Sequence, residues 1–297
     1  MEVLLWILAA LLPSVCLGVT FDEDFVDATT VQEERECHGT SVGFGYSGTL
    51  ELHYQQLRKR YVGCTYVHGN LEITNLDDSV LTYELDFLDS IKYVSGYVLI
   101  GLSTQVERIP LMSLEVIRGN HTYRIQGEEY ALVVALTSRD TTPVMGLRHL
   151  HMPKLKEISR GKVMFSQNPL LSHMGTVAWD IITRGRPDSM YLSDEKAFSF
   201  KDEVCPVVCK VDEDLSLCWG EEPNLCQDVV VGYCNETCGW RCYGPEADNC
   251  CHPDCAVGCT GPGPQECLVC KDYMLDEECV GYCPAKTYPK MQTCVRF

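Results

Sequence analysis

Four short apolar runs recur along the first two thirds of the chain. They read GNLEIT from Gly69, GYVLIGL from Gly96, YALVVAL from Tyr130 and GKVMFS from Gly161, so they start 27 to 34 residues apart. Each run is short and rich in Val, Ile and Tyr, which is typical of β-strands. Strands that return at this spacing predict a solenoid, in which the aliphatic side chains of each turn pack on those of the next.

A second phrase returns with the same period. Before three of the runs a leucine is followed three residues later by an isoleucine, at Leu88 and Ile91, Leu114 and Ile117, and Leu155 and Ile158. An ordinary leucine-rich repeat has a shorter period and a stricter asparagine pattern. We therefore favour a right-handed β-helix with wider turns, and we expect Asn70, Asn120 and Asn168 to bond turn backbones from inside.

Helical periodicity is confined to LHYQQLRKRY, which precedes Cys64. The two early cysteines, Cys37 and Cys64, bracket this segment. Because the terminal turn of a solenoid must cover an exposed core, we expect a short helix here, stapled as an end cap.

The chain opens with MEVLLWILAALLPSVCLG, whose apolar core runs from Val3 to Leu12 and is followed by the small residues Cys16 and Gly18. A membrane anchor needs about 20 apolar residues, and this run stops at Pro13. The pattern predicts a secretory signal peptide over residues 1–18, a linker over 19–36 and an extracellular product. No later stretch is apolar enough to cross a membrane.

Charge and cysteine usage narrow the class of protein. The chain has 42 acidic and 24 basic residues, a net charge of −18 that disfavours nucleic acid and anionic lipid as partners. Of 19 cysteines, 16 lie between Cys205 and Cys294. In an exported chain this density predicts disulfides. We therefore expect two domains, an apolar one over 37–200 and a cross-linked one over 201–297.

Two other kinds of site, a zinc site and a catalytic site, fit the sequence less well. CLVC followed by Cys279 and Cys283 approximates the spacing of a zinc ribbon, but an exported chain with an even set of mature cysteines favours disulfides over metal. GxSxG, HExxH and glycine-rich phosphate-loop motifs are absent, so we expect neither an enzyme nor a cofactor. Sequons at Asn120 and Asn235 predict surface glycans.

The phrases CHGTS, GNLEIT, GYVLIGLSTQVERIPL, LEVIRGN and YALVVAL, followed by CWG, CCHPDC, GCTGP and CLVC, resemble the epidermal growth factor receptor family. The resemblance covers residues 37–294 and corresponds to the first receptor L domain and the first furin-like cysteine-rich region. It implies nine disulfide pairs: Cys37 with Cys64, Cys205 with Cys218, Cys209 with Cys226, Cys234 with Cys242, Cys238 with Cys250, Cys251 with Cys259, Cys255 with Cys267, Cys270 with Cys279, and Cys283 with Cys294.

The chain departs from the family pattern in two places. Family members usually carry one more bridge at the junction of the two domains, where this chain has Ser172 and no further cysteine before Cys205. The junction should then depend on packing, and the resemblance implies that Trp179 wedges between the domains. The other departure is the loop PAKTYPKMQT between Cys283 and Cys294. It replaces the long arm through which family receptors dimerise, so we expect no back-to-back dimer.

The resemblance also implies a ligand site near the N-terminal strand of the L domain. Its residues would be Phe44, Tyr46 and Gly48, alternating on one side of a strand, with Asn75, Leu102 and Ala135 from successive turns. An edge that contains glycine lets the backbone of another strand approach. The alternative is that these residues only cap the solenoid.

Two functions follow from the resemblance. One is a secreted binding protein that takes up an epidermal-growth-factor-like polypeptide, or pairs with a related receptor, and acts as a sink or modulator. The other is an N-terminal fragment or splice product of a receptor tyrosine kinase whose transmembrane and kinase parts lie elsewhere. Family receptors hold ligand between two L domains and this chain has one, so we expect weak binding unless the chain pairs.

Overall fold

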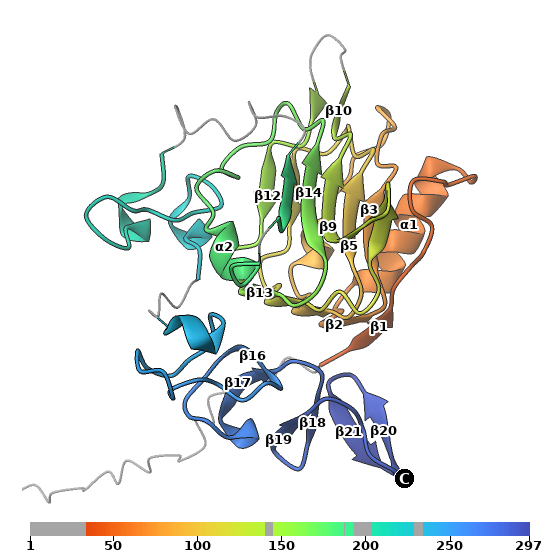
Figure 1. Cartoon of the computed structure of the whole chain (residues 1–297). Coiled ribbons are helices and arrows are strands. Elements are labelled where there is room, and N and C mark those ends of the chain that lie inside the picture. The colour runs from red at the N-terminus through yellow and green to blue at the C-terminus, as the bar shows by residue number, and fades with distance from the viewer. Residues whose placement is uncertain (1–33, 140–144, 187, 193–203, 229–233) are drawn as a thin grey trace, which may run out of the picture. The chain divides into compact units, whose positions relative to one another are not determined.

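The structure is a computed structural model, shown in Figure 1, that describes residues 34–139, 145–186, 188–192, 204–228 and 234–297. The predicted signal peptide and all but the last residues of the predicted linker lie outside these ranges. The expected boundary between the domains, at residue 200, also lies outside them. Strand pairing begins at Glu36, which was assigned to the linker.

Two sheets of mostly parallel strands form the first domain. The smaller has the order β1 (Glu36–His38), β2 (Tyr66–His68), β4 (Tyr93–Val94), β7 (Val116–Ile117) and β13 (Glu157–Ile158). The larger has the order β15 (Met190–Leu192), β14 (Lys162–Ser166), β9 (Glu128–Ala135), β5 (Val98–Gly101) and β3 (Leu71–Thr74), with β8 (Tyr123–Ile125) antiparallel to β9.

The four strand predictions are confirmed, because β3, β5, β9 and β14 fall on the four apolar runs. Successive strands pair in parallel within both sheets, an arrangement consistent with the predicted β-helix. The core consists of side chains at matched register positions, such as Ile73, Ile100, Val134 and Phe165. Burying each of these side chains stabilises the fold by about 1.5–3 kcal/mol.

Two short strand pairs extend the turns. They are β6 (Arg108–Pro110) with β12 (His149–His151), in parallel, and β10 (Ser138–Arg139) with β11 (Met145–Gly146), antiparallel. A 3₁₀ turn, η1 (Asp86–Leu88), precedes β4. A short helix, α2 (Trp179–Ile182), follows β14.

The predicted helix is α1 (Leu50–Tyr61), which begins two residues before the predicted segment. Figure 1 shows it beside β3 at one end of the larger sheet. The Thr49 side chain caps its first turn, and Leu57 and Tyr61 face the core. Cys37 and Cys64 are bonded to each other, as the end-cap interpretation expects.

Two of the three asparagines bond turn backbones. Asn70 Nδ2 donates to the carbonyl of Thr40 at 2.9 Å, and buried Asn168 donates to that of Val134 at 2.9 Å. The prediction is wrong for Asn120, which is exposed and accepts a hydrogen bond from the Arg160 side chain. The loop that carries Asn120 turns outward, so its amide does not reach the stacked core.

Short elements and disulfides make up the second domain. Its strands are β16 (Cys255–Cys259), β17 (Cys267–Cys270), β18 (Tyr273–Leu275), β19 (Glu278–Val280), β20 (Thr287–Lys290) and β21 (Thr293–Arg296). Its 3₁₀ turns are η3 (Val207–Cys209), η4 (Pro223–Leu225), η5 (Glu236–Cys238) and η6 (Pro264–Glu266).

The structure contains the same nine disulfide pairs that the resemblance implies. Both cysteines of CLVC are bonded, Cys267 to Cys255 and Cys270 to Cys279, so neither is free for zinc. Among the described residues no group of three or more His, Cys, Asp and Glu side chains is placed to hold a metal ion. Nor does any described helix have the length and apolarity that a bilayer crossing needs.

Candidate functional site

The outer face of the larger sheet carries an apolar cluster of its own. Side chains alternate along a strand, so Val98 and Ile100 point into the core while Leu99 points outward. The outward cluster consists of Tyr97, Leu99, Tyr130, Val133 and Ala135. These five residues are at most 7% exposed, because four half-buried side chains lie over them: Phe44, Tyr123, Ile125 and Met164. The half-buried covering side chains give this face an accessible apolar surface, which is a candidate binding surface.

Phe44 lies on this outer face because Gly101 leaves room for its ring. A Cβ atom at position 101 would collide with the Phe44 ring and would lie 2.8 Å from the Ala135 carbonyl oxygen. The ring also meets Tyr123 edge-on, with 6.0 Å between centroids. The structure therefore brings together two of the predicted site residues, Phe44 and Ala135.

Glu72 holds the backbone before Phe44 in place. Its carboxylate accepts hydrogen bonds from the backbone N–H of Val42 at 2.7 Å and of Gly43 at 3.0 Å. The Tyr97 hydroxyl donates to the same carboxylate at 2.7 Å. Burial and this bond to Glu72 raise the pKa of Tyr97. A buried carboxylate with three donors fixes the segment on which Phe44 sits.

The strand expected over Phe44, Tyr46 and Gly48 does not form. This segment is a turn followed by irregular chain, and its side chains diverge. Phe44 points to the sheet, whereas the Tyr46 ring packs on His53 of α1 at 4.2 Å between centroids and its hydroxyl reaches back to Gly48. The hydrogen bonds to Glu72 and the packing of Phe44 against Gly101 hold this segment in a bent conformation. Its side chains therefore do not alternate between two sides as they would along an extended strand.

The predicted residues from successive turns lie at the end of neighbouring strands. Asn75 and Leu102 follow the paired residues Thr74 and Gly101, and both adopt left-handed backbone, with φ of 57° and 50°. Ala135 pairs with Gly101 and is buried, so the counterpart of Leu102 in the next turn is Leu136, with φ of 58°. Leu136 is 38% exposed, and sequence reasoning missed it by one position.

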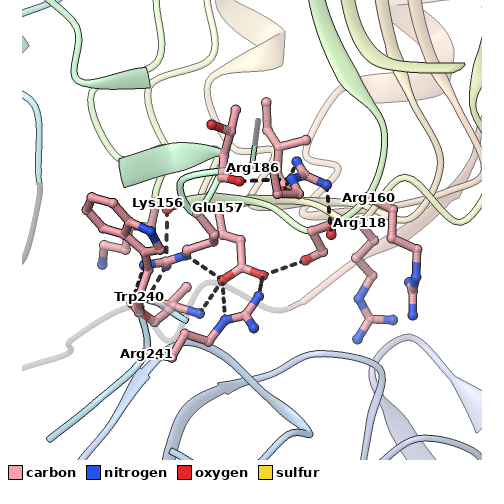
Figure 2. A network of polar contacts seen from close by, with 12 residues as sticks. Arg118, Lys156, Glu157, Arg160, Arg186, Trp240 and Arg241 are labelled. Carbon is pink, nitrogen blue, oxygen red and sulfur yellow. Dashed lines mark hydrogen bonds and ion pairs between the residues drawn. The ribbon is translucent and has the colours of Figure 1, made fainter. Parts of the chain in front are cut away.

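A second cluster joins the first domain to the cysteine-rich one (Figure 2). Glu157 of β13 is fully buried and accepts from Arg241 Nη2 at 2.6 Å and from Arg184 Nε at 3.0 Å. The Val257 N–H and the Ser159 hydroxyl complete its shell at 2.7 and 2.8 Å. Burial alone would raise the pKa of this carboxyl, but the Arg241 hydrogen bond and the two guanidinium charges lower it to about 2.

Asp272 of the cysteine-rich domain receives two further arginines. Buried Arg118 donates to its carbonyl oxygen and lies 5.6 Å above the Tyr273 ring. Arg160 Nη2 lies 3.2 Å from the Asp272 carboxylate. A buried charge without a partner is costly, so the two arginines favour the arrangement in which Asp272 is within reach. Asp272 directly precedes β18, and these bonds therefore hold β18 against the smaller sheet.

Trp179 contacts both domains. Its ring packs edge-on against Phe165 of β14 at 5.3 Å and against Trp219 of the cysteine-rich domain at 5.4 Å, while its N–H donates to the Met174 carbonyl. Ser172, at the place of the missing bridge, donates twice to the Arg148 carbonyl. This placement fits the wedge that the resemblance implies, although the role of Trp179 stays a prediction.

Sequence reasoning missed Glu157, Arg241 and Trp219. The only signal for Glu157 is a charged residue within the apolar repeat phrase KLKEIS. The predicted glycan sites differ in setting: Asn120 is exposed, whereas half-buried Asn235 caps η5 through its side chain.

Comparisons with known proteins agree with this architecture. The Receptor L domain family matches residues 63–183, and the Furin-like cysteine rich region family matches residues 194–297. The chain is 37% identical over 252 residues to the epidermal growth factor receptor of Drosophila melanogaster, covering 84% of this chain and 16% of that protein. It is 37% identical over 277 residues to the epidermal growth factor receptor of Gallus gallus, covering 93% and 37%.

A third relative is the receptor tyrosine-protein kinase erbB-2 of Rattus norvegicus, 35% identical over 259 residues that cover 84% of this chain and 20% of that protein. The chain thus spans between 16% and 37% of the length of these relatives. The matched region contains no kinase domain. The chain is a receptor L domain followed by a furin-like cysteine-rich region, and it belongs with the ectodomains of the epidermal growth factor receptor family.

Proposed function

We propose that this chain binds an epidermal-growth-factor-like polypeptide outside the cell on the outer face of its larger sheet, and that it acts as a ligand sink or modulator. The observation that carries the proposal is the layer of half-buried apolar side chains on that face, Phe44, Tyr123, Ile125 and Met164. Phe44, Leu102 and Leu136 offer apolar contact beside it, and Asn75 offers a polar one. A partly buried apolar patch with polar neighbours is the usual composition of a protein interface.

The short loop between Cys283 and Cys294 supports a role without back-to-back dimers. It forms the tight antiparallel hairpin of β20 and β21, in which Tyr288 packs on Phe297. A hairpin of this size offers no projecting arm to a second copy. Capture of ligand, rather than signalling through a dimer, is the activity that fits such a loop.

The second candidate function, an N-terminal piece of a receptor tyrosine kinase, is favoured by the relatives, among which is a receptor tyrosine-protein kinase. A full-length transcript map separates the two. A reading frame that continues after Phe297 into a second L domain supports the receptor, and a stop codon there supports the sink.

The binding face is tested with Leu102→Asn and Leu136→Asn in the full secreted chain. Both positions have left-handed backbone, which asparagine adopts more readily than leucine, so each variant should fold at least as well as the parent. We expect each to weaken capture of an epidermal-growth-factor-like polypeptide about tenfold in surface plasmon resonance, since each removes apolar contact.

Glu277→Asn is the matched control. It introduces asparagine at another left-handed position, φ 72°, in the β18–β19 hairpin, away from the apolar face. Its ligand affinity should equal that of the parent. Equal affinity of all three variants, or no capture by the parent of any polypeptide in a panel of this class, would contradict the proposed binding.

A further inference from the structure

The first part of the cysteine-rich domain, residues 204–228, contains one buried segment and one exposed segment. Leu217, Cys218 and Trp219 are buried, and Cys218 N–H and Trp219 face the first domain through Thr176 and Trp179. The segment 204–215, which we call the valine loop, precedes these buried residues along the chain. Residues 217–219 therefore pack against the first domain, whereas much of the valine loop is exposed to solvent.

The valine loop exposes aliphatic side chains to an unusual extent. Val207 is 89% exposed, Val204 77% and Val208 67%, and Val211 and Leu215 are also exposed. Soluble proteins scatter exposed aliphatic residues singly, whereas a group of them marks an interaction site. Five within twelve residues form such a group.

The loop is held in a fixed form, so the exposure does not reflect a frayed segment. Two cysteines of the loop are bonded to residues that follow it, Cys205 to Cys218 and Cys209 to Cys226. The Val211 N–H donates to the Leu215 carbonyl at 2.8 Å, and the Asp212 carboxylate accepts from the Leu215 N–H at 2.8 Å. A preformed loop loses little conformational entropy when it binds.

Charge around the valine loop selects its partner. Residues 204–228 contain six acidic side chains against one lysine. Three of these acids, Asp212, Glu213 and Asp214, are exposed at the tip of the loop. A second copy would bring the same acids together in a two-fold contact, and nucleic acid or anionic lipid would be repelled. A basic segment with an apolar face complements both the charge and the aliphatic surface.

We propose that the valine loop is a docking surface for a basic, amphipathic segment of another protein. Apolar side chains of the partner cover Val204, Val207 and Val208, and its lysines or arginines meet Glu213 and Asp214. The surface belongs to the cysteine-rich domain and lies on different residues from the proposed ligand face.

The test uses the full chain and a fluorescent 18-residue peptide of lysine and leucine with amphipathic helical order. Fluorescence anisotropy should show binding that weakens at least about fivefold in the double variant Val207→Ser, Val208→Ser. The matched control is Val80→Ser, because Val80 is 88% exposed but lies alone in the first domain. Its affinity should equal that of the parent.

A second variant tests the charge. Glu213→Gln with Asp214→Asn should weaken binding and flatten its dependence on salt, since two ion contacts are lost. Asp212 is left unchanged because it caps the turn. Titration of free thiols in each variant shows that the bridges are intact.

Four results would overturn the proposal. They are absence of peptide binding, equal binding by the serine double variant and the Val80→Ser control, and equally tight binding of a peptide with glutamate in place of lysine. The fourth is a concentration-dependent dimer that the serine double variant abolishes, because the occupant would then be a second copy.

Discussion

At the scale of single residues, the strongest energetic statements concern two buried ionisable groups at the junction of the domains. Glu157 is charged and fully paired, whereas His151 is neutral and nearly surrounded by protein. Burial and nearby His149 lower the pKa of His151 to about 4. The two groups therefore make stability depend on pH in different windows.

Replacing Glu157 by glutamine should lower the free energy of unfolding at pH 7 by about 3–5 kcal/mol, because Arg184 and Arg241 would keep their charges in a buried site. Urea unfolding followed through the fluorescence of Trp179 and Trp219 measures this loss. The control is Asp86→Asn, which removes an exposed partner of Arg108 and should change stability by less than about 1 kcal/mol. Similar losses for the two variants would contradict the buried-pair account.

The Glu157 carboxyl also makes the stability of the fold fall at strongly acidic pH. Its pKa of about 2 is below the usual 4.5, so its stabilising contribution is complete above pH 4.5 and is lost as pH falls towards 2.

His151 should make the protein less stable at mildly acidic pH. Its pKa in the folded state is below the usual 6.5, so the unfolded chain binds a proton first. Stability is then complete above pH 6.5 and falls below it by up to about 1.4 kcal/mol per pH unit until pH 4. Urea titrations at pH 7, 6 and 5 should show a smaller slope for His151→Gln. An unchanged slope in that variant would contradict the assignment to His151.

At the scale of elements, the strands of the repeat follow one regular pattern, and a helix covers its terminal turn. The same register repeats through β3, β5, β9 and β14, so inward positions are apolar in every turn. Helix α1 breaks this pattern and covers the terminal turn, with Leu57 and Tyr61 on its buried side. At its N-terminus the Thr49 side chain accepts a hydrogen bond from the Leu52 N–H.

Removing that cap should weaken the covered end. Thr49→Ala should lower the free energy of unfolding by about 1 kcal/mol, because the Leu52 N–H loses its acceptor, and Thr49→Ser should restore most of it. Hydrogen exchange of the α1 amides measures the local change. Faster exchange in the serine variant than in the alanine variant would rule out the capping explanation.

At the scale of the whole molecule, the two domains are stabilised by different means. The first buries a continuous aliphatic core and has one bridge, Cys37–Cys64. The second has eight bridges and few buried aliphatic side chains. Each bridge that closes a short loop contributes about 2–3 kcal/mol.

Mild reduction should therefore unfold the domains separately. After treatment with dithiothreitol at neutral pH, the amides of β3, β5 and β9 should stay protected from hydrogen exchange, and those of residues 234–297 should lose protection. Mass spectrometry of peptic fragments resolves the two regions. Equal loss of protection in both would show that the bridges also hold the first domain together.

Much of the architecture follows from local patterns. The positions of β3, β5, β9 and β14 are visible as apolar runs, because strand formation and inward packing act on neighbouring residues. Helix α1 and its bridge are visible for the same reason. Contacts between distant segments leave no such trace: Glu157 meets Arg241 and Val257, 84 and 100 positions away, and no local pattern selects them.

The candidate site divides in the same way. The sequence by itself determined the repeated strands, because their apolar runs are local patterns, and its family resemblance assigned Asn75 and Leu102 to successive turns. Only the tertiary structure decided that Leu136 rather than Ala135 completes that row and that Phe44 occupies the space above Gly101. These depend on side-chain volume at a point where three chain segments meet, and such packing is fixed only when the segments are placed in space.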